Sequence, residues 1–501
     1  MNSSFQYHEK ILKTYIYMVQ KCFSKCRKKA REPCYNMPRI CQFTRGKRNY
    51  CRLNTPYFLD KTNKCAITKK RMKVNKKMAK LKIGRFMLKT GDRRRGVFLK
   101  TICSDSGACI AFGTQIQKIN TFFNNFSNFD LAVSPVVSIG AVSANGFVKE
   151  IKYEREGYEA YAVLKSSARS RGDNLMYEYE VGKYINKQNK LFPCFLETYG
   201  MFSYKSEGPW NYSKTAKTIS TKILETSLSH LTKIDYATGC LKSKHLAILI
   251  QHIKNAKSFG TLNIEFLKLK SSAKIVSAFN HEMVCVLYQI YMPLASLAKN
   301  FTHYDLHQEN VLLYEPQKNS YITYRYHFGQ VVHTFKSRYI AKIIDYGRSF
   351  YIDGDKNSLK TYNTICGTAE CDPQCGADNG FNILGPERHP GSFHYISSQK
   401  RNISHDLRLA TTIRFPRQKT YLQNVIDKVE YSSPYGTKEI LSKEFPVKIN
   451  NVVDMWSALS EIINDPAYKT ANDEYFNTLS HVGVFDIYYD GRPMKFTAAT
   501  D

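Results

Sequence analysis

Residues 303–314 carry polar side chains at spacings that could support chemistry. The stretch reads HYDLHQENVLLY, with Asp305 and Asn310 five residues apart and a histidine two residues to either side of Asp305. Carboxylate and amide oxygens are the hard ligands that Mg²⁺ prefers. An apolar run follows directly and predicts a buried strand. The sequence therefore predicts a polar loop that is anchored by a strand and needs further residues to act.

Two more apolar segments end at charged residues. AKIIDYGRS (341–349) reads as a strand that ends at Asp345, and YEAYAVLKSS (158–167) reads as a strand that is apolar up to Lys165. The apolar residues before Lys165 argue against an ordinary surface lysine, which has a polar neighbourhood more often.

A helix follows the second of these segments. Residues 173–188 begin with an Asp N-cap and continue with apolar residues at helical spacing. Glu178 and Glu180 both compete for the position that faces Lys165. We prefer Glu178, because Val181 and Ile185 then fall three and seven residues later, on the packed face.

The surrounding elements alternate between strands and helices. Glycines at 140 and 146 bound a turn between two strands, residues 204–219 predict a polar loop, and the apolar spacing from Met283 to Leu297 predicts an amphipathic helix. In chain order the predicted elements are strand–turn–strand at 136–154, the loop at 204–219, a strand at 245–253, a helix at 279–299 and a β-hairpin at 314–342.

The ordered set of lysine, glutamate, His-x-Asp-x-x-x-x-Asn and Asp-x-Gly resembles the protein-kinase superfamily. The His-Tyr-Asp-Leu-His loop and the Ile-Ile-Asp-Tyr-Gly-Arg turn are similar to those of divergent kinases of large nucleocytoplasmic DNA viruses. The resemblance covers residues 135–410 and implies an α+β, bilobal protein-kinase-like fold with a basic N-terminal extension. It divides the chain into an extension (1–130), an N-lobe (131–255) and a C-lobe with insertions (256–501).

The resemblance also implies roles for particular residues in binding Mg-ATP. The turn from Gly140 to Gly146 would lay backbone N–H groups over the phosphates, where side chains would obstruct. Lys165 would contact the α- and β-phosphates, held by Glu178. The remaining predicted nucleotide contacts are Val148 after the turn and the backbone of Gln251 and Ile253, which would read the edge of adenine.

The catalytic roles follow the same pattern. Asp305 would accept the proton of the acceptor hydroxyl, while Asn310 and Asp345 would hold Mg²⁺, or Mn²⁺ in its place. His307 stands where Ser/Thr protein kinases commonly have lysine, and it could contact the γ-phosphate. His303 would support the loop, and Asp406 would cap the loop's backbone.

Several positions depart from the family pattern. Tyr304 replaces the usual arginine before the catalytic aspartate. The 40 residues from Asp305 to Asp345 exceed the usual spacing of these two motifs. We therefore predict an inserted β-hairpin between them. The form His-x-Asp-Leu-His is also similar to the small-molecule phosphotransferases of the superfamily. The substrate class is therefore open between proteins and small molecules.

Charge is concentrated at the N-terminus. Residues 1–100 hold 29 Lys+Arg against 4 Asp+Glu, and the rest of the chain holds 45 against 38. Such an arm could neutralise the phosphates of a nucleic acid. Six cysteines in this part have irregular spacing, which leaves zinc binding and reduced thiols both open: Cys22, Cys26, Cys34, Cys41, Cys51 and Cys65.

The resemblance implies an Mg-ATP-dependent enzyme, a Ser/Thr protein kinase with a protein substrate. The alternatives are a small-molecule phosphotransferase and a nucleotide-binding pseudokinase whose basic arm binds nucleic acid. We find no signal peptide and no apolar run long enough to span a bilayer. We therefore expect the protein in the host cytoplasm, a viral factory or the virion, and not secreted.

Overall fold

The computed structural model divides the chain into two compact units, Met1–Val97 and Phe98–Asp501. It describes residues 110–139, 146–168, 175–225, 245–269, 272–358, 360–361, 400–416, 420–430, 443 and 447–499. It also gives the backbone of six strands: β1 (Cys41–Thr44), β2 (Tyr50–Leu53), β3 (Tyr57–Leu59), β4 (Cys65–Ile67), β19 (Phe381–Leu384) and β20 (Phe393–Ile396). Gly140 and the side chains of the N-terminal arm lie outside the described residues.

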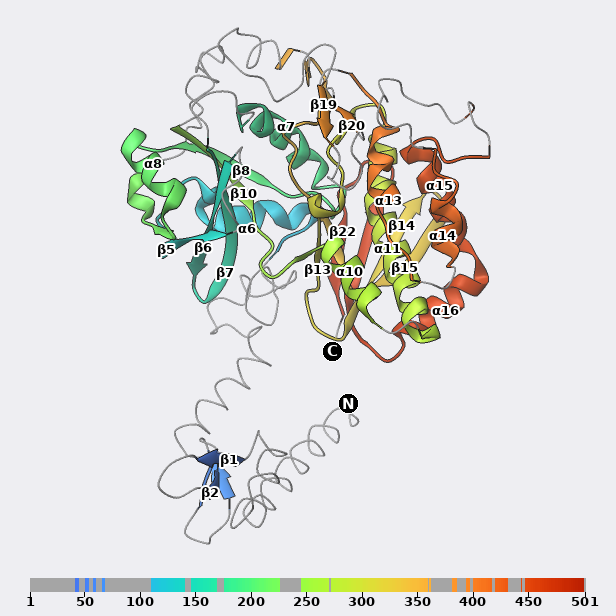
Figure 1. The fold of residues 1–501 in the computed structure, drawn as a ribbon, viewed down its shortest axis with the longest axis horizontal. Helices are drawn as coiled ribbons and strands as arrows, with labels where there is room; N and C mark the ends of the chain where they lie inside the picture. The colour runs from blue at the N-terminus through green and yellow to red at the C-terminus, as the bar shows by residue number, and fades with distance from the viewer. Residues whose placement is uncertain are drawn as a thin grey trace. The chain divides into compact units, whose positions relative to one another are not determined.

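An antiparallel six-stranded sheet forms the first part of the second unit (Figure 1). Its strand order is β8-β10-β7-β6-β5-β9, and the predicted strands at 136–154, 158–167 and 245–253 are confirmed. The strands are β5 (Ala132–Ile139), β6 (Gly146–Arg155), β7 (Tyr158–Ser167), β8 (Thr198–Ser203), β9 (Thr218–Ile219) and β10 (Leu246–Gln251).

One face of this sheet is closed by aromatic residues from the preceding segment. Strand β6 alternates buried and partly exposed residues, as expected where the two faces differ. Phe123 and Phe126 follow α6 (Ile116–Phe122) and are buried in the same cluster as Phe147 and Ile151 of β6. The segment 110–130 therefore belongs to the core of this sheet.

The predicted loop at 204–219 is wrong in part. The segment contains the helix α8 (Glu207–Thr215), which buries Trp210 and Ser213. The Trp210 indole N–H donates to the Ser167 carbonyl at 2.9 Å. The buried tryptophan supplies the tertiary contact that composition alone, rich in Lys, Ser and Thr, did not indicate.

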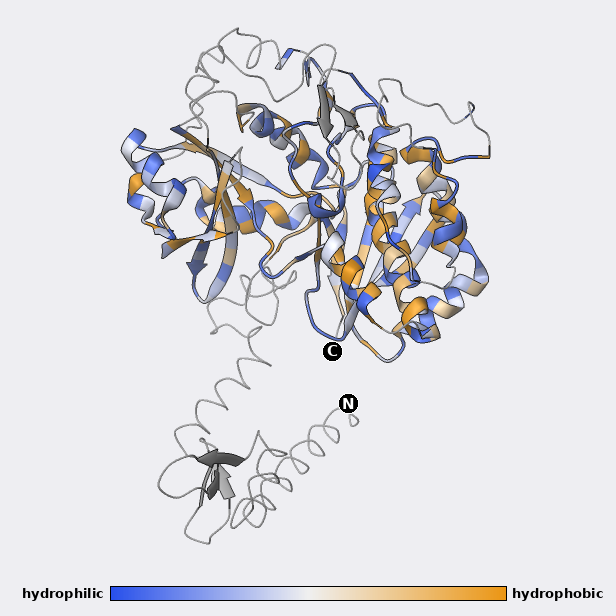
Figure 2. Ribbon diagram, in the orientation of Figure 1, coloured by the Kyte–Doolittle hydropathy of each residue, from blue (hydrophilic) through white to orange (hydrophobic). Residues whose placement is uncertain are grey.

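Helices dominate the second part. The predicted helix at 279–299 is confirmed as α11 (Ala273–Ser296), which is capped by Ser272 and runs through Pro293. Its hydrophobic residues and those of α15 appear as orange segments in Figure 2. The other helices of this part are α10 (Phe259–Lys268), α13 (Arg408–Thr411), α14 (Tyr421–Ile426), α15 (Val452–Asn464) and α16 (Pro466–Phe476).

Two small sheets carry the polar loop. In one, β13 (Val311–Tyr314) lies between β11 (Lys257–Ser258) and β16 (Ile340–Ile343). In the other, β17 (Phe350–Asp353) lies between β12 (Phe301–Thr302) and β18 (Lys356–Asn357). The helix that carries Glu178, predicted at 173–188, is confirmed as α7 (Leu175–Gln188).

The predicted hairpin at 314–342 is confirmed and belongs to a larger sheet. Strands β14 (Ser320–Phe328) and β15 (Val331–Ser337) pair antiparallel. The C-terminal strand β21 (Ser480–Tyr488) pairs parallel to β14, and β22 (Lys495–Ala498) completes the order β15-β14-β21-β22. Among the described residues, no helix is long and apolar enough to cross a membrane.

Candidate functional site

Strand pairing places Lys165 in the interior of the six-stranded sheet, between β10 and β6. Lys165 lies opposite Val148 of β6 and Ile248 of β10. Gly146 begins β6, and a Cβ there would lie 2.7 Å from the Ser166 carbonyl oxygen, so the close approach of the two strands requires glycine. The predicted nucleotide residues Gly146, Val148 and Lys165 are thus neighbours on two paired strands.

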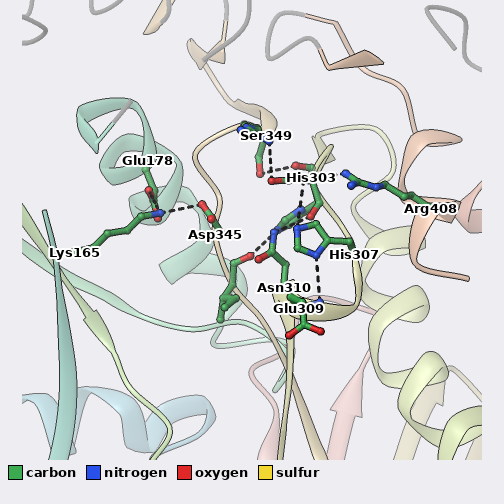
Figure 3. A network of polar contacts seen from close by, with 12 residues as sticks. Lys165, Glu178, His303, His307, Glu309, Asn310, Asp345, Ser349 and Arg408 are labelled. Carbon is green, nitrogen blue, oxygen red and sulfur yellow. Dashed lines mark hydrogen bonds and ion pairs between the residues drawn. The ribbon is translucent and has the colours of Figure 1, made fainter. Parts of the chain in front are cut away.

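Two acidic residues meet at the end of the Lys165 side chain (Figure 3). The Lys165 ammonium group lies 2.7 Å from Glu178 Oε2 and 3.0 Å from Asp345 Oδ1. Glu178 comes from α7 and is buried, whereas the Asp345 side chain is 44% exposed. Glu180 instead pairs with Lys183. The structure therefore joins Lys165, Glu178 and Asp345 into one ion-pair network.

The pKa values of this network favour the charged forms. Partial burial opposes the charge on Lys165, but attraction to Asp345 and Glu178 is stronger and raises the pKa of Lys165. Desolvation by neighbouring atoms opposes ionisation of Asp345. Attraction to Lys165 outweighs that effect and lowers the pKa of Asp345 to about 2. Asp345 is therefore a carboxylate at neutral pH.

The loop after β12 is fixed through its backbone. The two Asp406 oxygens accept the N–H groups of His303 at 2.8 Å and Tyr304 at 2.9 Å. The His303 ring donates from Nε2 to the Ile344 carbonyl at 3.0 Å, and Ser349 Oγ donates to the His303 carbonyl at 3.2 Å. Because a carbonyl only accepts, the tautomer of His303 carries its proton on Nε2.

Further hydrogen bonds bring Asn310 beside the strand that leads to Asp345. The Ile344 N–H donates to the Asn310 carbonyl at 3.0 Å, and Val311 pairs with Ile343 across β13 and β16. Asn310 Nδ2 donates to the Asp305 carbonyl at 2.9 Å, which fixes the orientation of its amide. Asp305, Asn310 and Asp345 therefore belong to one connected loop system.

Two non-glycine residues of this loop system adopt left-handed backbone conformations. Tyr304 has φ 65° and Asp345 has φ 67°. Such positions cost about 1–3 kcal/mol each and concentrate at functional sites. The hydrogen bond to Asp406 and the packing of the Tyr304 ring on His405, 5.0 Å between centroids, hold the first of them.

Asp305 is held by two arginines. Arg348 Nη1 lies 3.0 Å from Asp305 Oδ2, and Arg408 Nη1 lies 2.9 Å from Asp305 Oδ1. Burial opposes ionisation of Asp305, but attraction to Arg348, His307 and Arg408 outweighs it and lowers the pKa of Asp305. Each oxygen of this carboxylate therefore holds one guanidinium group.

His307 lies close to the same carboxylate. The Glu309 N–H donates to His307 Nδ1 at 3.2 Å, and His307 Nε2 is 3.7 Å from Asp305 Oδ1. Burial lowers the pKa of His307 in spite of the attraction of Asp305. The ring is therefore neutral at pH 7 and turns its Nε2–H toward Asp305.

Gln251 and Ile253 lie at the end of the sheet, apart from the polar loop. Gln251 ends β10 opposite Ala162, and its N–H donates to the Glu197 carbonyl at 2.8 Å. The Ile253 carbonyl accepts from the Ala256 N–H at 3.2 Å. Neither bond uses the Gln251 carbonyl or the Ile253 N–H, the two groups predicted to read adenine.

Sequence reasoning missed the two arginines on Asp305. Arg348 follows the Asp345-Tyr346-Gly347 turn directly, and its position beside a predicted metal ligand was a usable signal. Arg408 lies two residues after Asp406, which was predicted to cap the loop. Because Asp406 bonds the backbone of the loop, Arg408, two residues later, lies close enough to reach Asp305 on that loop.

No model of a known protein family matches this chain, and no curated protein matches it. The arrangement of the described side chains is therefore the basis on which a function can be assigned.

Proposed function

We propose that this protein is a Mg-ATP-dependent phosphotransferase, a Ser/Thr protein kinase with a bilobal kinase-like fold. The observation that carries the proposal is the convergence of Lys165, Glu178 and Asp345 within 3.0 Å, from positions 13 and 180 residues apart in the chain. A lysine held by one buried acid and facing one exposed acid suits a phosphate chain and its metal.

The donor set fits a magnesium ion that is completed by phosphates. Asp345 offers a partly exposed carboxylate and Asn310 an amide, both hard oxygen donors. Among the residues the structure describes, no group of three or more His, Cys, Asp or Glu side chains could hold a metal. Magnesium in ATP sites is bound by one or two protein oxygens plus phosphates, so this set suffices. When bound, the metal would neutralise phosphate charge, and Mn²⁺ suits the same donors.

The chain's own residues would act on the acceptor. Asp305 takes the proton of the acceptor hydroxyl, whose oxygen forms a bond to the γ-phosphorus. The bond between that phosphorus and the bridging oxygen of ADP breaks, and its electron pair leaves on ADP. Lys165 holds the phosphates, and Glu178 orients Lys165. His307, whose Nε2–H faces Asp305, is the predicted contact of the γ-phosphate.

A small-molecule acceptor is the second candidate. It is favoured by the enclosure of Asp305, whose side chain is 12% exposed between Arg348, Arg408 and His307. A small alcohol reaches such a carboxylate more easily than a folded protein does. The basic arm, residues 1–100, stays a predicted nucleic-acid contact in either case.

Labelled ATP with magnesium tests the proposal. Purified protein is incubated with a mixed protein substrate, beside Asp305→Asn and the matched control Asp490→Asn, an exposed acid that pairs with Arg492. We expect label on protein from the wild type and from Asp490→Asn. Asp305→Asn should lower the rate by about 10²–10⁴-fold, because the base is lost, while Mg-ATP still raises Tm.

Other outcomes decide between the candidates. Label on metabolites alone would favour the small-molecule enzyme. A rise in Tm with Mg-ATP but no transfer to any acceptor would favour a nucleotide-binding pseudokinase. Neither transfer nor a shift in Tm would refute the proposal.

A further inference from the structure

The residue before Glu178 on α7 forms a buried hydrogen bond with the segment that follows Asp345. The Tyr177 hydroxyl donates to the Ser349 carbonyl at 2.6 Å, across 172 residues of the chain. Both residues are fully buried. Because a hydrogen bond is stronger in apolar surroundings, where water does not replace it, this contact fixes the distance between α7 and Ser349.

Ser349 continues the connection to the polar loop. Its Oγ donates to the His303 carbonyl at 3.2 Å, and His303 lies two residues before Asp305 (Figure 3). This bond is buried as well. Tyr177, Ser349 and His303 therefore form a continuous buried path from the helix of Glu178 to the loop of Asp305.

Other contacts between α7 and β17 are less directed. Lys187 pairs with Asp353 at 2.7 Å, but the lysine side chain is 61% exposed, so solvent screens the pair. Tyr184 packs on the Tyr351 ring, with centroids 5.6 Å apart, and apolar packing of this kind is non-directional. Of the three contacts, the hydrogen bond of Tyr177 is therefore the one that sets a distance.

The proposed transfer depends on groups at both ends of this path. Lys165, held by Glu178, would hold the phosphates, and Asp305 would receive the proton of the acceptor hydroxyl. A misplacement of about 1 Å between such groups costs up to about 10²-fold in rate, although each group still binds its own partner. A bond that fixes the helix against the loop therefore acts on the rate of transfer more than on nucleotide binding.

We infer that Tyr177 is a positioning residue for phosphoryl transfer and that it acts through Ser349. The bond of its hydroxyl aligns the Lys165–Glu178 pair with Asp305. The inference rests on the proposed function and adds to its site a residue that the sequence pattern did not indicate.

Removal of the single hydroxyl tests the inference. Tyr177→Phe keeps the ring in the core and should lower kcat by about 3–10-fold, the effect of one hydrogen bond. The KM for Mg-ATP should change by less than about twofold, because the Lys165–Glu178 pair stays intact. Rates are measured per folded molecule, well below Tm, with labelled ATP and the acceptor that the wild type labels.

Two other tyrosines provide matched controls. Tyr184→Phe removes a hydroxyl of the same helix that has no hydrogen-bond partner among the described residues, and it should leave kcat unchanged. Tyr288→Phe removes a buried hydroxyl that bonds His333 at 2.6 Å and so joins α11 to β15. It should lower Tm but leave kcat unchanged. The pair separates loss of alignment from loss of a tyrosine hydroxyl and from loss of stability.

A double-mutant cycle identifies the path. Ser349→Ala breaks the bond to His303 but keeps the backbone carbonyl that Tyr177 bonds. In that background Tyr177→Phe should lower kcat by less than about twofold, because the helix is already disconnected from the loop. A hydroxyl that only stabilised the fold would lower kcat equally in both backgrounds.

The outcomes separate this inference from the proposed function. An unchanged kcat in Tyr177→Phe, or equal losses of kcat in the two backgrounds, overturns the inference alone. A raised KM with unchanged kcat also overturns it, since Tyr177 would then act on nucleotide binding. Absence of transfer by the wild type to every acceptor, with Mg-ATP still raising Tm, overturns the phosphotransferase proposal and this inference with it.

Discussion

The polar network around Asp305 and the sheet β15-β14-β21-β22 are held together by different forces. In the network, directed bonds of 2.8–3.0 Å fix each side chain, such as those from His303 and Tyr304 to Asp406 and from Arg348 and Arg408 to Asp305. In the sheet, Phe485 packs on Phe112, Tyr324 and Phe496, with ring centroids 4.8, 5.3 and 4.8 Å apart.

This difference indicates that the network positions the side chains of the candidate site, whereas the sheet contributes mainly to the free energy of unfolding. Hydrogen bonds weaken steeply when their geometry changes, so the network specifies positions. Apolar packing is non-directional and scales with the area buried, so the sheet contributes free energy. Substitutions in the two regions should therefore affect different measurements.

The largest expected effect on stability is in the sheet. Phe485 is fully buried, and Phe485→Ala should lower the free energy of unfolding by about 3–5 kcal/mol, because it leaves a cavity among three rings. Denaturant titration measures this loss, with the exposed Val332→Ala as the control. A fall in the transfer rate per folded molecule would contradict the separation of the two regions.

In the network, Asp345→Asn should act on ligand binding. It keeps the shape of the side chain but removes the charge that faces Lys165 and, under the proposed function, would face the metal. We expect Mg-ATP to bind about tenfold more weakly or worse, about 1.4 kcal/mol, with a smaller change in unfolding. Titration calorimetry measures the affinity, and Asp353→Asn, which loses only the surface partner of Lys187, is the control. Equal affinities for the two variants would exclude Asp345 from the proposed metal site.

A pH titration extends the comparison to α11, which packs against β15 of the sheet. Burial lowers the pKa of His281 on α11 to about 4, below the usual 6.5. The unfolded state thus binds a proton first, so this contribution to stability is complete above pH 6.5 and is lost as pH falls toward 4. It amounts to at most about 3 kcal/mol. His281→Asn should lose less stability over that interval, and parallel curves for the two proteins would exclude this role.

The smallest effect is expected from an exposed ion pair. Lys257 lies 2.7 Å from Glu265 with both side chains about half exposed. Lys257→Ala should change the free energy of unfolding by less than about 0.5 kcal/mol, because solvent screens such pairs. A loss above about 1 kcal/mol by thermal unfolding would show that short ionic distances stabilise this protein even without burial.

Local patterns predicted the elements of the site well. The spacing from Glu178 to Val181 and Ile185 selected the glutamate that pairs with Lys165, since helical periodicity decides which residues face the core. The hairpin at 314–342 was likewise visible in its alternating β-branched and aromatic residues. Such predictions succeed because they depend on residues that are close to one another in the sequence.

Contacts between distant segments could not be predicted in this way. The partners of Asp305 lie 43 and 103 residues away, and no local pattern couples them. Strand β14 pairs parallel to β21, with Ser320 opposite Ser480. The composition of neither strand indicates that the other is its partner. The helix α8 was missed because its stability comes from burying Trp210, a tertiary contact.

The place of β21 in the sheet has a consequence for synthesis on the ribosome. Strand β14 can pair with β15 as soon as the hairpin emerges, but its other edge needs a strand roughly 150 residues further along, which takes about 8–30 s at ordinary elongation rates. An unpaired edge strand with three tyrosines invites association with other nascent chains. We therefore expect yield in a heterologous host to depend on elongation rate and chaperone supply during that interval.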